Sequence, residues 1–136
     1  MYNFKGKLDD KNRLTIPAEL RPELAGRLII TPGFDGSLHL YTESIWKKEL
    51  EPALAVNPQD SDRTPTILNQ QLAAQADFFF SDLQETDLDA RGRITFDQDL
   101  VVRVGMHEIK DLKAVRMPAA TGYYWKLRRA DRRPKI

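Results

Sequence analysis

Cysteine is absent from this sequence of 136 residues, and histidine occurs only twice. The lack of cysteine excludes disulfide bonds and thiolate metal sites, and it is typical of proteins from a reducing compartment. His39 and His107 each stand alone, without a carboxylate at the spacing of a metal ligand. The sequence also has no glycine-rich phosphate loop and no nucleophile elbow. We therefore expect no catalytic residue, no metal site and no cofactor, and the chain is not expected to be an enzyme.

Long hydrophobic runs are also missing. No apolar stretch approaches the roughly 18 residues that a membrane-spanning helix needs, and the first residues lack the apolar core of a signal peptide. The composition, 41% hydrophobic and 30% charged, is that of an ordinary folded protein. These features predict a cytoplasmic protein without a membrane partner and without a small-molecule substrate.

Net charge is small, at +1, but its distribution along the chain is uneven. The first 13 residues are rich in lysine and arginine, the stretch 77–89 carries only acidic charges, and the last 11 residues are again basic. Segregated charge on a nearly neutral chain predicts one face for a polyanion and another face for a different partner.

Two segments eighty residues apart resemble each other. "LDDKNRLTIP" occupies residues 8–17 and "LDARGRITFD" occupies residues 88–97, with leucine, aspartate, arginine and threonine at identical spacing. The surrounding pattern also repeats, since the order strand, turn, strand, helix, strand, turn, strand occurs twice. A half of about 55 residues with such short strands buries too little surface to be stable alone. We therefore expect two halves that share one β core with pseudo-twofold symmetry.

The expected boundaries follow from this repeat. The first half spans 1–56, a linker and helix span 57–81, and the second half spans 82–136. Alternation of apolar and polar residues, turn residues and helical spacing predict strands over 2–8, 13–16, 27–33, 37–42, 83–88, 93–96, 112–118 and 122–129, and helices over 17–25, 43–55, 66–80 and 97–104. Three consecutive phenylalanines, Phe78 to Phe80, and Trp46 are expected in core or subunit contacts.

The two charged turns have a common chemistry. Asp9 and Asp89 open the turns, where a carboxylate can accept hydrogen bonds from the backbone N–H groups that follow. Asn12 and Gly92 occupy the position that most needs a positive φ, which these residue types tolerate best. We therefore interpret these four residues as organisers of the turns.

Each turn also presents basic side chains. Lys11 and Arg91 are expected at the tips, and Arg13 and Arg93 on the strands that leave them. Repeated basic groups on matching turns favour contacts with phosphates and base edges. With the two lysines of the first strand, the candidate DNA-binding residues are Lys5, Lys7, Lys11, Arg13, Arg91 and Arg93.

Both turns, together with "GFDGSLHLYTESIWKKELE" and "FFFSDLQETDLDARGRI", resemble the MraZ family, bacterial transcriptional regulators associated with the division and cell-wall gene cluster. The resemblance spans nearly the whole chain, and it assigns Asp9 and Arg13 to a first D-x-x-x-R motif and Asp89 and Arg93 to a second. It implies an α+β fold, a double-split β barrel formed by two AbrB-like swapped-hairpin halves with helices packed outside. It further implies a nucleoid-associated, ring-shaped homo-oligomer that binds short direct repeats in double-stranded promoter DNA.

Two other functions stay open at the level of sequence. The first is an antitoxin-like AbrB-fold module, which binds DNA through the same kind of hairpin. The second is an oligomeric assembly protein that binds no DNA, in which the basic turns contact the acidic stretch 77–89 of a neighbouring copy. A steep dependence of binding on salt concentration distinguishes DNA binding from the second.

Overall fold

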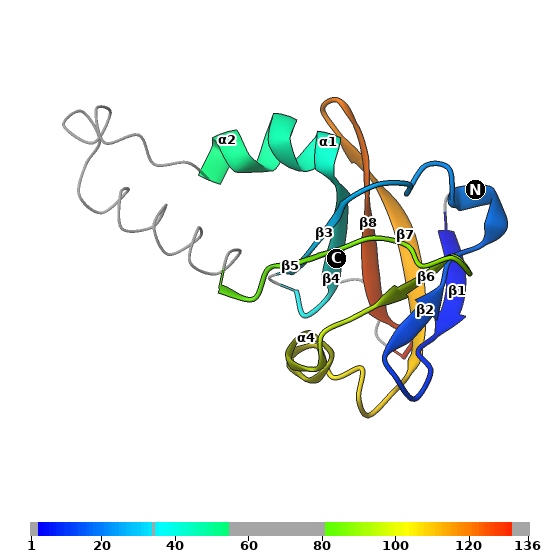
Figure 1. The fold of residues 1–136 in the computed structure, drawn as a ribbon. Helices are drawn as coiled ribbons and strands as arrows, with labels where there is room; N and C mark the ends of the chain where they lie inside the picture. Colours follow the sequence, from blue (N-terminus) through cyan, green and yellow to red (C-terminus); the bar gives the residue numbers. More distant parts are fainter. Residues whose placement is uncertain (1–2, 34, 55–80, 132–136) are drawn as a thin grey trace, which may run out of the picture.

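The computed structural model describes residues 3–33, 35–54 and 81–131 (Figure 1). The helix expected over 66–80 and the phenylalanines 78–80 lie outside these ranges. Within them the chain is mostly antiparallel β structure with a few short helices, so the fold is of the α+β class.

The main layer is an open six-stranded antiparallel sheet with the strand order β1-β7-β8-β4-β3-β5. Its strands are β1 (Asn3–Lys7), β3 (Leu28–Pro32), β4 (Leu38–Thr42), β5 (Gln84–Thr86), β7 (Asp111–Ala119) and β8 (Gly122–Arg129). A separate two-stranded antiparallel ribbon pairs β2 (Arg13–Thr15) with β6 (Arg93–Thr95). The strands lie close to the ranges expected from the pattern of apolar residues.

The strand order is a palindrome with respect to the sequence repeat. When β1 is exchanged with β5, β7 with β3 and β8 with β4, the same order is obtained, read from the opposite edge of the sheet. The opening strand of each half pairs with a strand of the other half, because β1 pairs with β7 and β5 pairs with β3. The halves are therefore intertwined, because the strand at each edge of the sheet pairs with a strand of the other half.

One core cluster joins both sheets. It contains apolar side chains from the six-stranded sheet, from the ribbon and from the segments that connect them. Leu14 of β2 and Ile94 of β6 are register partners, and both are fully buried. Phe4 of β1 packs against Trp125 of β8, with ring centroids 5.5 Å apart. The ribbon thus covers this core with its apolar face and turns its other face outward.

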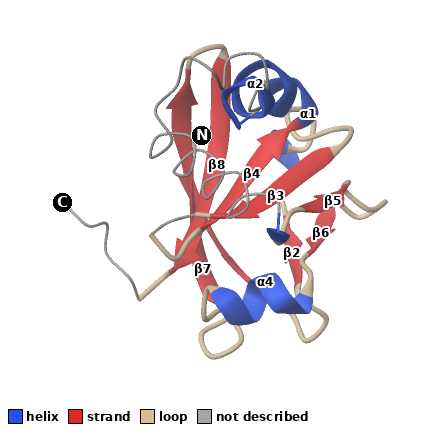
Figure 2. Cartoon of the chain, turned by 90° about the vertical axis from the view of Figure 1, so that its left-hand side faces the viewer, coloured by secondary structure: helices blue, strands red, loops and turns tan. Residues whose placement is uncertain are grey.

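The helices are short and lie at two places. The segments α1 (Glu43–Ile45), η2 (Trp46–Leu50, a π-helical turn) and α2 (Glu51–Leu54) follow β4 without a break, and α4 (Gln98–Arg103) follows β6. Figure 2 shows α1 and α2 at one end of the molecule and α4 at the other. Thr42 caps the first of these helices, since its hydroxyl accepts a hydrogen bond from the Ile45 N–H at 3.4 Å.

A second apolar cluster lies under α1 and η2. It consists of Ile29, Tyr41, Ile45 and Trp46. Trp46 is only 5% exposed, so the expectation that it lies in a core contact is confirmed. With Ile45 it packs against Ile29 and Tyr41, and the helical segment thereby covers this part of the outer face of the sheet.

The helix expected over 17–25 is also shorter than its pattern suggested. Only Ala18–Leu20 (η1) forms a 3₁₀ turn, and irregular turns follow it. Pro22 explains this difference, because proline has no N–H to donate and its ring clashes with the preceding turn of a helix.

The ribbon core gives a stability test. Leu14→Ala and Ile94→Ala should each lower the free energy of unfolding by roughly 2–5 kcal/mol, because each removes a fully buried side chain. Thr95→Ala, on the exposed face of the same ribbon, should change it by no more than about 0.5 kcal/mol. Chemical denaturation measures all three, and a large difference between the Leu14 and Ile94 variants would contradict an equal role of the two halves.

Candidate nucleic-acid interface

The first charged turn is a tight hairpin between β1 and β2. The Asp9 N–H donates to the Arg13 carbonyl at 3.0 Å, and the Asn12 N–H donates to the Asp9 carbonyl at 3.1 Å. Asn12 has a φ of 59°, the left-handed conformation expected at this position. This pattern is that of a hairpin loop of about three residues in which a type I turn ends in a left-handed residue.

The second turn repeats the first nearly atom for atom. The Asp89 N–H donates to the Arg93 carbonyl at 3.0 Å, and the Gly92 N–H donates to the Asp89 carbonyl at 3.0 Å. Gly92 has a φ of 74°, again as expected. Asparagine in one half and glycine in the other thus solve the same backbone requirement.

In each turn the aspartate organises the backbone and holds an arginine. Asp9 Oδ1 accepts hydrogen bonds from the N–H groups of Lys11 and Arg13, both at 2.9 Å, and its Oδ2 accepts one from Arg13 Nε at 2.6 Å. In the second turn, Asp89 Oδ1 accepts from two N–H groups at 2.9 Å and Oδ2 from Arg93 Nε at 2.8 Å. The guanidinium group is therefore oriented by its Nε and keeps its two terminal nitrogens for other acceptors.

These hydrogen bonds require the ionised carboxylate. Partial desolvation acts to raise the pKa of Asp9, but the hydrogen bonds from Arg13 and Lys11 outweigh it and lower this pKa to about 2. The backbone hydrogen bond from Arg93 is the main cause of the lowered pKa of Asp89. A lowered folded-state pKa means that the turn is stabilised above the ordinary value of 3.8 and loses this support as the pH falls towards 2. The turns are thus fully braced at neutral pH.

The ribbon brings the two braced arginines onto one face. Arg13 pairs with Thr95 and Arg93 pairs with Thr15, and these four residues alternate with the buried Leu14 and Ile94. Diagonal neighbours on one face of an antiparallel pair lie about 7–8 Å apart, so Arg13 and Arg93 lie near each other on the outward face. Because β2 and β6 are antiparallel, the two turns themselves lie at opposite ends of this ribbon.

The other expected contacts are placed differently. Lys11 and Arg91 are exposed at the two tips, one at each end of the ribbon. Lys5 and Lys7 are exposed on the outer face of β1, which belongs to the main sheet and not to the ribbon. The structure therefore brings Arg13 and Arg93 together and separates the remaining four candidate residues.

Sequence reasoning missed two basic residues beside the turns. Arg21 donates from Nε to the Ile16 carbonyl at 3.0 Å, and its side chain lies directly against Gly92. Lys110 Nζ lies 3.2 Å from Asp10 Oδ1, at the first turn. Arg21 contacts the second turn and Lys110 contacts the first, and each residue is far in sequence from the turn that it contacts. Only the pairing of the two halves could have indicated them.

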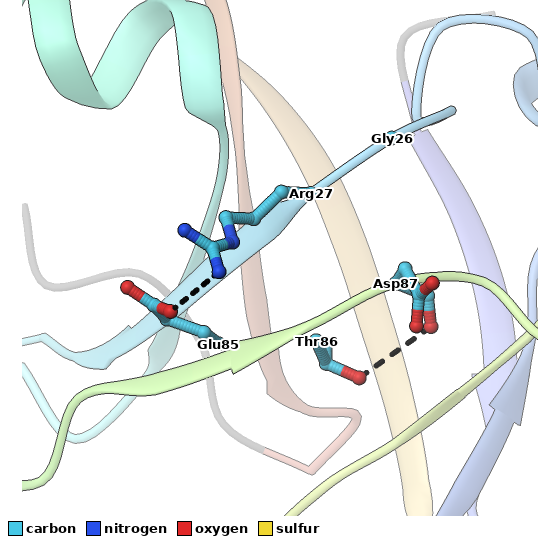
Figure 3. Close-up of a pocket in the computed structure, with 5 residues that line it drawn as sticks. All are labelled: Gly26, Arg27, Glu85, Thr86 and Asp87. Atoms are coloured by element: carbon cyan, nitrogen blue, oxygen red, sulfur yellow. Dashed lines mark hydrogen bonds and ion pairs between the residues drawn. The ribbon is translucent and has the colours of Figure 1, made fainter.

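A polar recess of about 410 Å³ lies between the start of β3 and β5 (Figure 3). Arg27 and Glu85 face each other across it, with Nη2 and Oε2 3.3 Å apart. Thr86 donates to the backbone carbonyl of Asp87 at 3.4 Å. Its charged groups largely satisfy one another, and it offers no convergent set of groups for a ligand.

No group of three or more histidine, aspartate or glutamate side chains among the described residues lies close enough together to hold a metal ion. Within the same residues, none of the helices combines the length and the apolar character needed to cross a bilayer.

The described residues form a duplicated β protein that presents two aspartate-braced arginines on one exposed ribbon, and comparisons with known proteins assign the chain to a family. The family model "MraZ protein, putative antitoxin-like" matches residues 3–66. A "Transcriptional regulator MraZ" of Clostridium botulinum is 34% identical over 112 residues, which cover 82% of this chain and 71% of the relative. The proteins of the same name from Clostridium acetobutylicum and Corynebacterium efficiens are 38% identical over 98 residues and 43% identical over 92 residues, covering 72% and 68% of this chain and 63% and 58% of the relatives.

The chain therefore belongs to the MraZ family. Its relatives are named as transcriptional regulators and the family is not one of enzymes, which agrees with the expectation drawn from the sequence. The chain spans slightly less than two thirds of the length of several of these relatives, 63% and 61% in two cases.

The brace of the first turn can be tested by substitution. Asp9→Ala removes both oxygens, so the amide protons of Lys11 and Arg13 should exchange with solvent markedly faster. Asp9→Asn keeps one oxygen for the two N–H groups but loses the charge and the acceptor for Arg13 Nε, so the exchange of these two amides should change much less. Hydrogen exchange followed by NMR measures both variants. Asp10→Ala, at the neighbouring exposed position, is the control and should leave these two amides protected.

Proposed function

We propose that the chain is a sequence-specific DNA-binding transcriptional regulator that contacts double-stranded DNA through the β2–β6 ribbon and its two turns. The single observation that carries this proposal is the joint placement of Arg13 and Arg93 on the outward face of the ribbon, each held by an aspartate. The names of the relatives support the regulatory part of the proposal.

The ribbon has the dimensions that a DNA groove accepts. The major groove is about 12 Å wide and admits a two-stranded β-ribbon. An arginine whose two terminal nitrogens point outward can donate two hydrogen bonds to O6 and N7 of a guanine. Because Nε is already bonded to an aspartate, the guanidinium plane is oriented before DNA arrives. Arg13 and Arg93 are therefore assigned to base edges.

The tips have a different role in the proposal. Lys11 and Arg91 lie at opposite ends of the ribbon and form no ion pair with another described residue. A ribbon lying in the groove directs its two ends towards the phosphates on either side. Contacts with phosphates fix register and orientation and supply salt-dependent affinity.

We further propose an oligomer that engages several DNA boxes at once. One ribbon makes few phosphate contacts, and so few contacts give little affinity at cellular salt. Linking equivalent sites can raise the overall affinity by roughly 10² to 10⁴ without a new kind of contact. A closed ring of identical subunits, formed by one contact repeated through rotation, would present the ribbons in succession to short direct repeats in promoter DNA.

The remaining parts of the proposal concern architecture and setting. Residues 1–56 and 82–136 form the two AbrB-like halves, and 57–81 connect them. The proposed architecture is a double-split β barrel, and the intertwined pairing of the open sheet and the ribbon supports it. The resemblance to the family favours promoters of the division and cell-wall gene cluster as targets and a cytoplasmic, nucleoid-associated protein.

Substitution of the braced arginines tests base recognition. Arg13→Ala and Arg93→Ala should each weaken binding to a selected DNA fragment by about 1–3 kcal/mol, which is about 5- to 150-fold, and should relax the sequence preference. Lys48→Gln, a change at an exposed position of η2, is the matched control and should bind as the wild type does. Binding is measured by fluorescence anisotropy, and unchanged affinity in a folded Arg13→Ala protein would count against the assignment.

Spacing of the boxes tests the oligomeric arrangement. DNA with several evenly spaced copies of one box should bind far more tightly than DNA with one copy. Insertion of about five base pairs, roughly half a helical turn, should weaken binding because it rotates the second box to the other side of the duplex. Light scattering gives the mass of the free protein in parallel. Equal affinity for single, correctly spaced and shifted boxes would refute simultaneous binding.

A further inference from the structure

Three cations lie side by side on the outer face of the main sheet. Lys5 of β1 is the register partner of Lys113 of β7, and Lys113 is the register partner of Arg128 of β8. The neighbouring pair Phe4 and Ala114 faces the core, so the three cations face away from it. We name Lys5, Lys113 and Arg128 the cationic row.

This arrangement works against folding. Like charges directly opposite each other on neighbouring strands are destabilising, and residues on adjacent strands are only about 5 Å apart. Most basic residues close to the row have acidic partners: Lys110 with Asp10, Arg116 with Glu23, Lys126 with Asp35 and Arg129 with Asp131. For the cationic row the described residues provide no ion pair. An anion supplied from outside the chain would remove the repulsion.

The other half of the molecule uses the equivalent position differently. By the palindromic strand order, the row that corresponds to the cationic row consists of Glu85, Ile29 and Tyr41, which are register partners on β5, β3 and β4. There Ile29 and Tyr41 pack against Ile45 and Trp46 of the helical segment that follows β4. An apolar row fits a helix, whereas three adjacent cations fit a polyanion. The two halves have therefore diverged at this face while keeping the same charged turn.

The cationic row is continuous with the first turn. β1 ends at Lys7, two residues before Asp9, and at about 3.3 Å per residue Lys5 lies within about 13 Å of the turn. A groove of about 320 Å³ lies beside Lys5 and Lys113 of the row, and its other lining residues are Gly6, Asp111, Leu112 and Ala130. Asp111 is its one acidic lining residue among those described, so positive charge predominates.

DNA that contacts the first turn, at the end of the ribbon, can extend to this face. A duplex carries one negative charge per roughly 1.7 Å of axis, so a duplex seated on the first turn presents several further phosphates within the distance to Lys5. An acidic protein segment of similar charge density would need many consecutive acidic residues. The proximity to the proposed DNA-binding turn therefore favours nucleic acid as the occupant.

We propose that the cationic row binds the phosphate backbone of the DNA that flanks the box contacted by the ribbon. This inference rests on the proposed function, and it adds Lys113 and Arg128 to the interface. Because phosphates carry no sequence information, the row contributes affinity and salt dependence but not preference for one box.

The test compares Lys5→Gln, Lys113→Gln, Arg128→Gln and the triple variant with wild-type protein. Each lost phosphate contact lowers the slope of log affinity against log salt concentration by about 0.9, so the triple variant should lose roughly 2 to 3 units of slope. The loss should be the same on DNA with and without boxes, and hydroxyl-radical protection of the flanking backbone should disappear. Thermal unfolding should show no loss of stability, since the substitutions remove a repulsion.

Two controls separate this inference from the proposed function. Lys48→Gln removes an exposed lysine from η2 and should leave the slope unchanged. Arg13→Ala should reduce the preference for box over random DNA, which the row variants leave intact. Unchanged slope and flanking protection in the triple variant, with the Arg13 effect present, would overturn the row and leave the function standing.

The other outcomes are equally decisive. In one of them, the wild type binds DNA with and without boxes equally well, while the row variants bind both more weakly. This result would support the cationic row and overturn sequence-specific regulation. No DNA binding by the wild type would overturn both. A change in the mass of the assembly without a change in salt slope would identify the row as a contact between copies of the chain and would overturn its role towards DNA.

Discussion

The antiparallel pairing of β2 with β6 is the interaction on which the rest of the structure depends. It joins the two halves, it buries Leu14 against Ile94, and it fixes the conformation of both turns. The Ile16 N–H donates to the Gly92 carbonyl and the Phe96 N–H donates to the Asn12 carbonyl, both at 2.9 Å. The left-handed residue of each turn is thus bonded to the strand of the other half. Association of the halves and formation of the proposed site are therefore one event.

Much of the local structure was predictable, because it depends on residues close in sequence. The identical spacing of aspartate, left-handed residue and arginine predicted two equivalent hairpins, and alternation predicted most strands. The helix expected over 17–25 is only a 3₁₀ turn at Ala18–Leu20, because Pro22 cannot continue a helix, and this proline is visible in the sequence. A core contact of Trp46 was predicted from the apolar spacing of its segment, but the face of the sheet that this segment covers was not visible in the sequence.

The arrangement of the site was not predictable from local pattern. Matching turns suggested matching tips, yet the antiparallel ribbon places the tips at opposite ends and brings Arg13 and Arg93 together in the middle. Arg21 reaches Gly92 across the pairing of the halves, a contact between residues with no sequence relationship. Register between distant strands decides these features, and it is set by burial of Leu14 and Ile94 rather than by the charged residues themselves.

The braced arginines and the unpaired lysines differ in what they can offer a polyanion. A guanidinium group bonded to a carboxylate is already partly neutralised, so it adds less to long-range attraction than its formal charge suggests. The same bond restricts its orientation, which favours discrimination between base edges. Lysines without an acidic partner have the opposite properties, because they attract phosphates but hold no fixed geometry. In the proposed complex with DNA, Arg13 and Arg93 would therefore supply selectivity, and cations such as Lys11 and the cationic row would supply affinity.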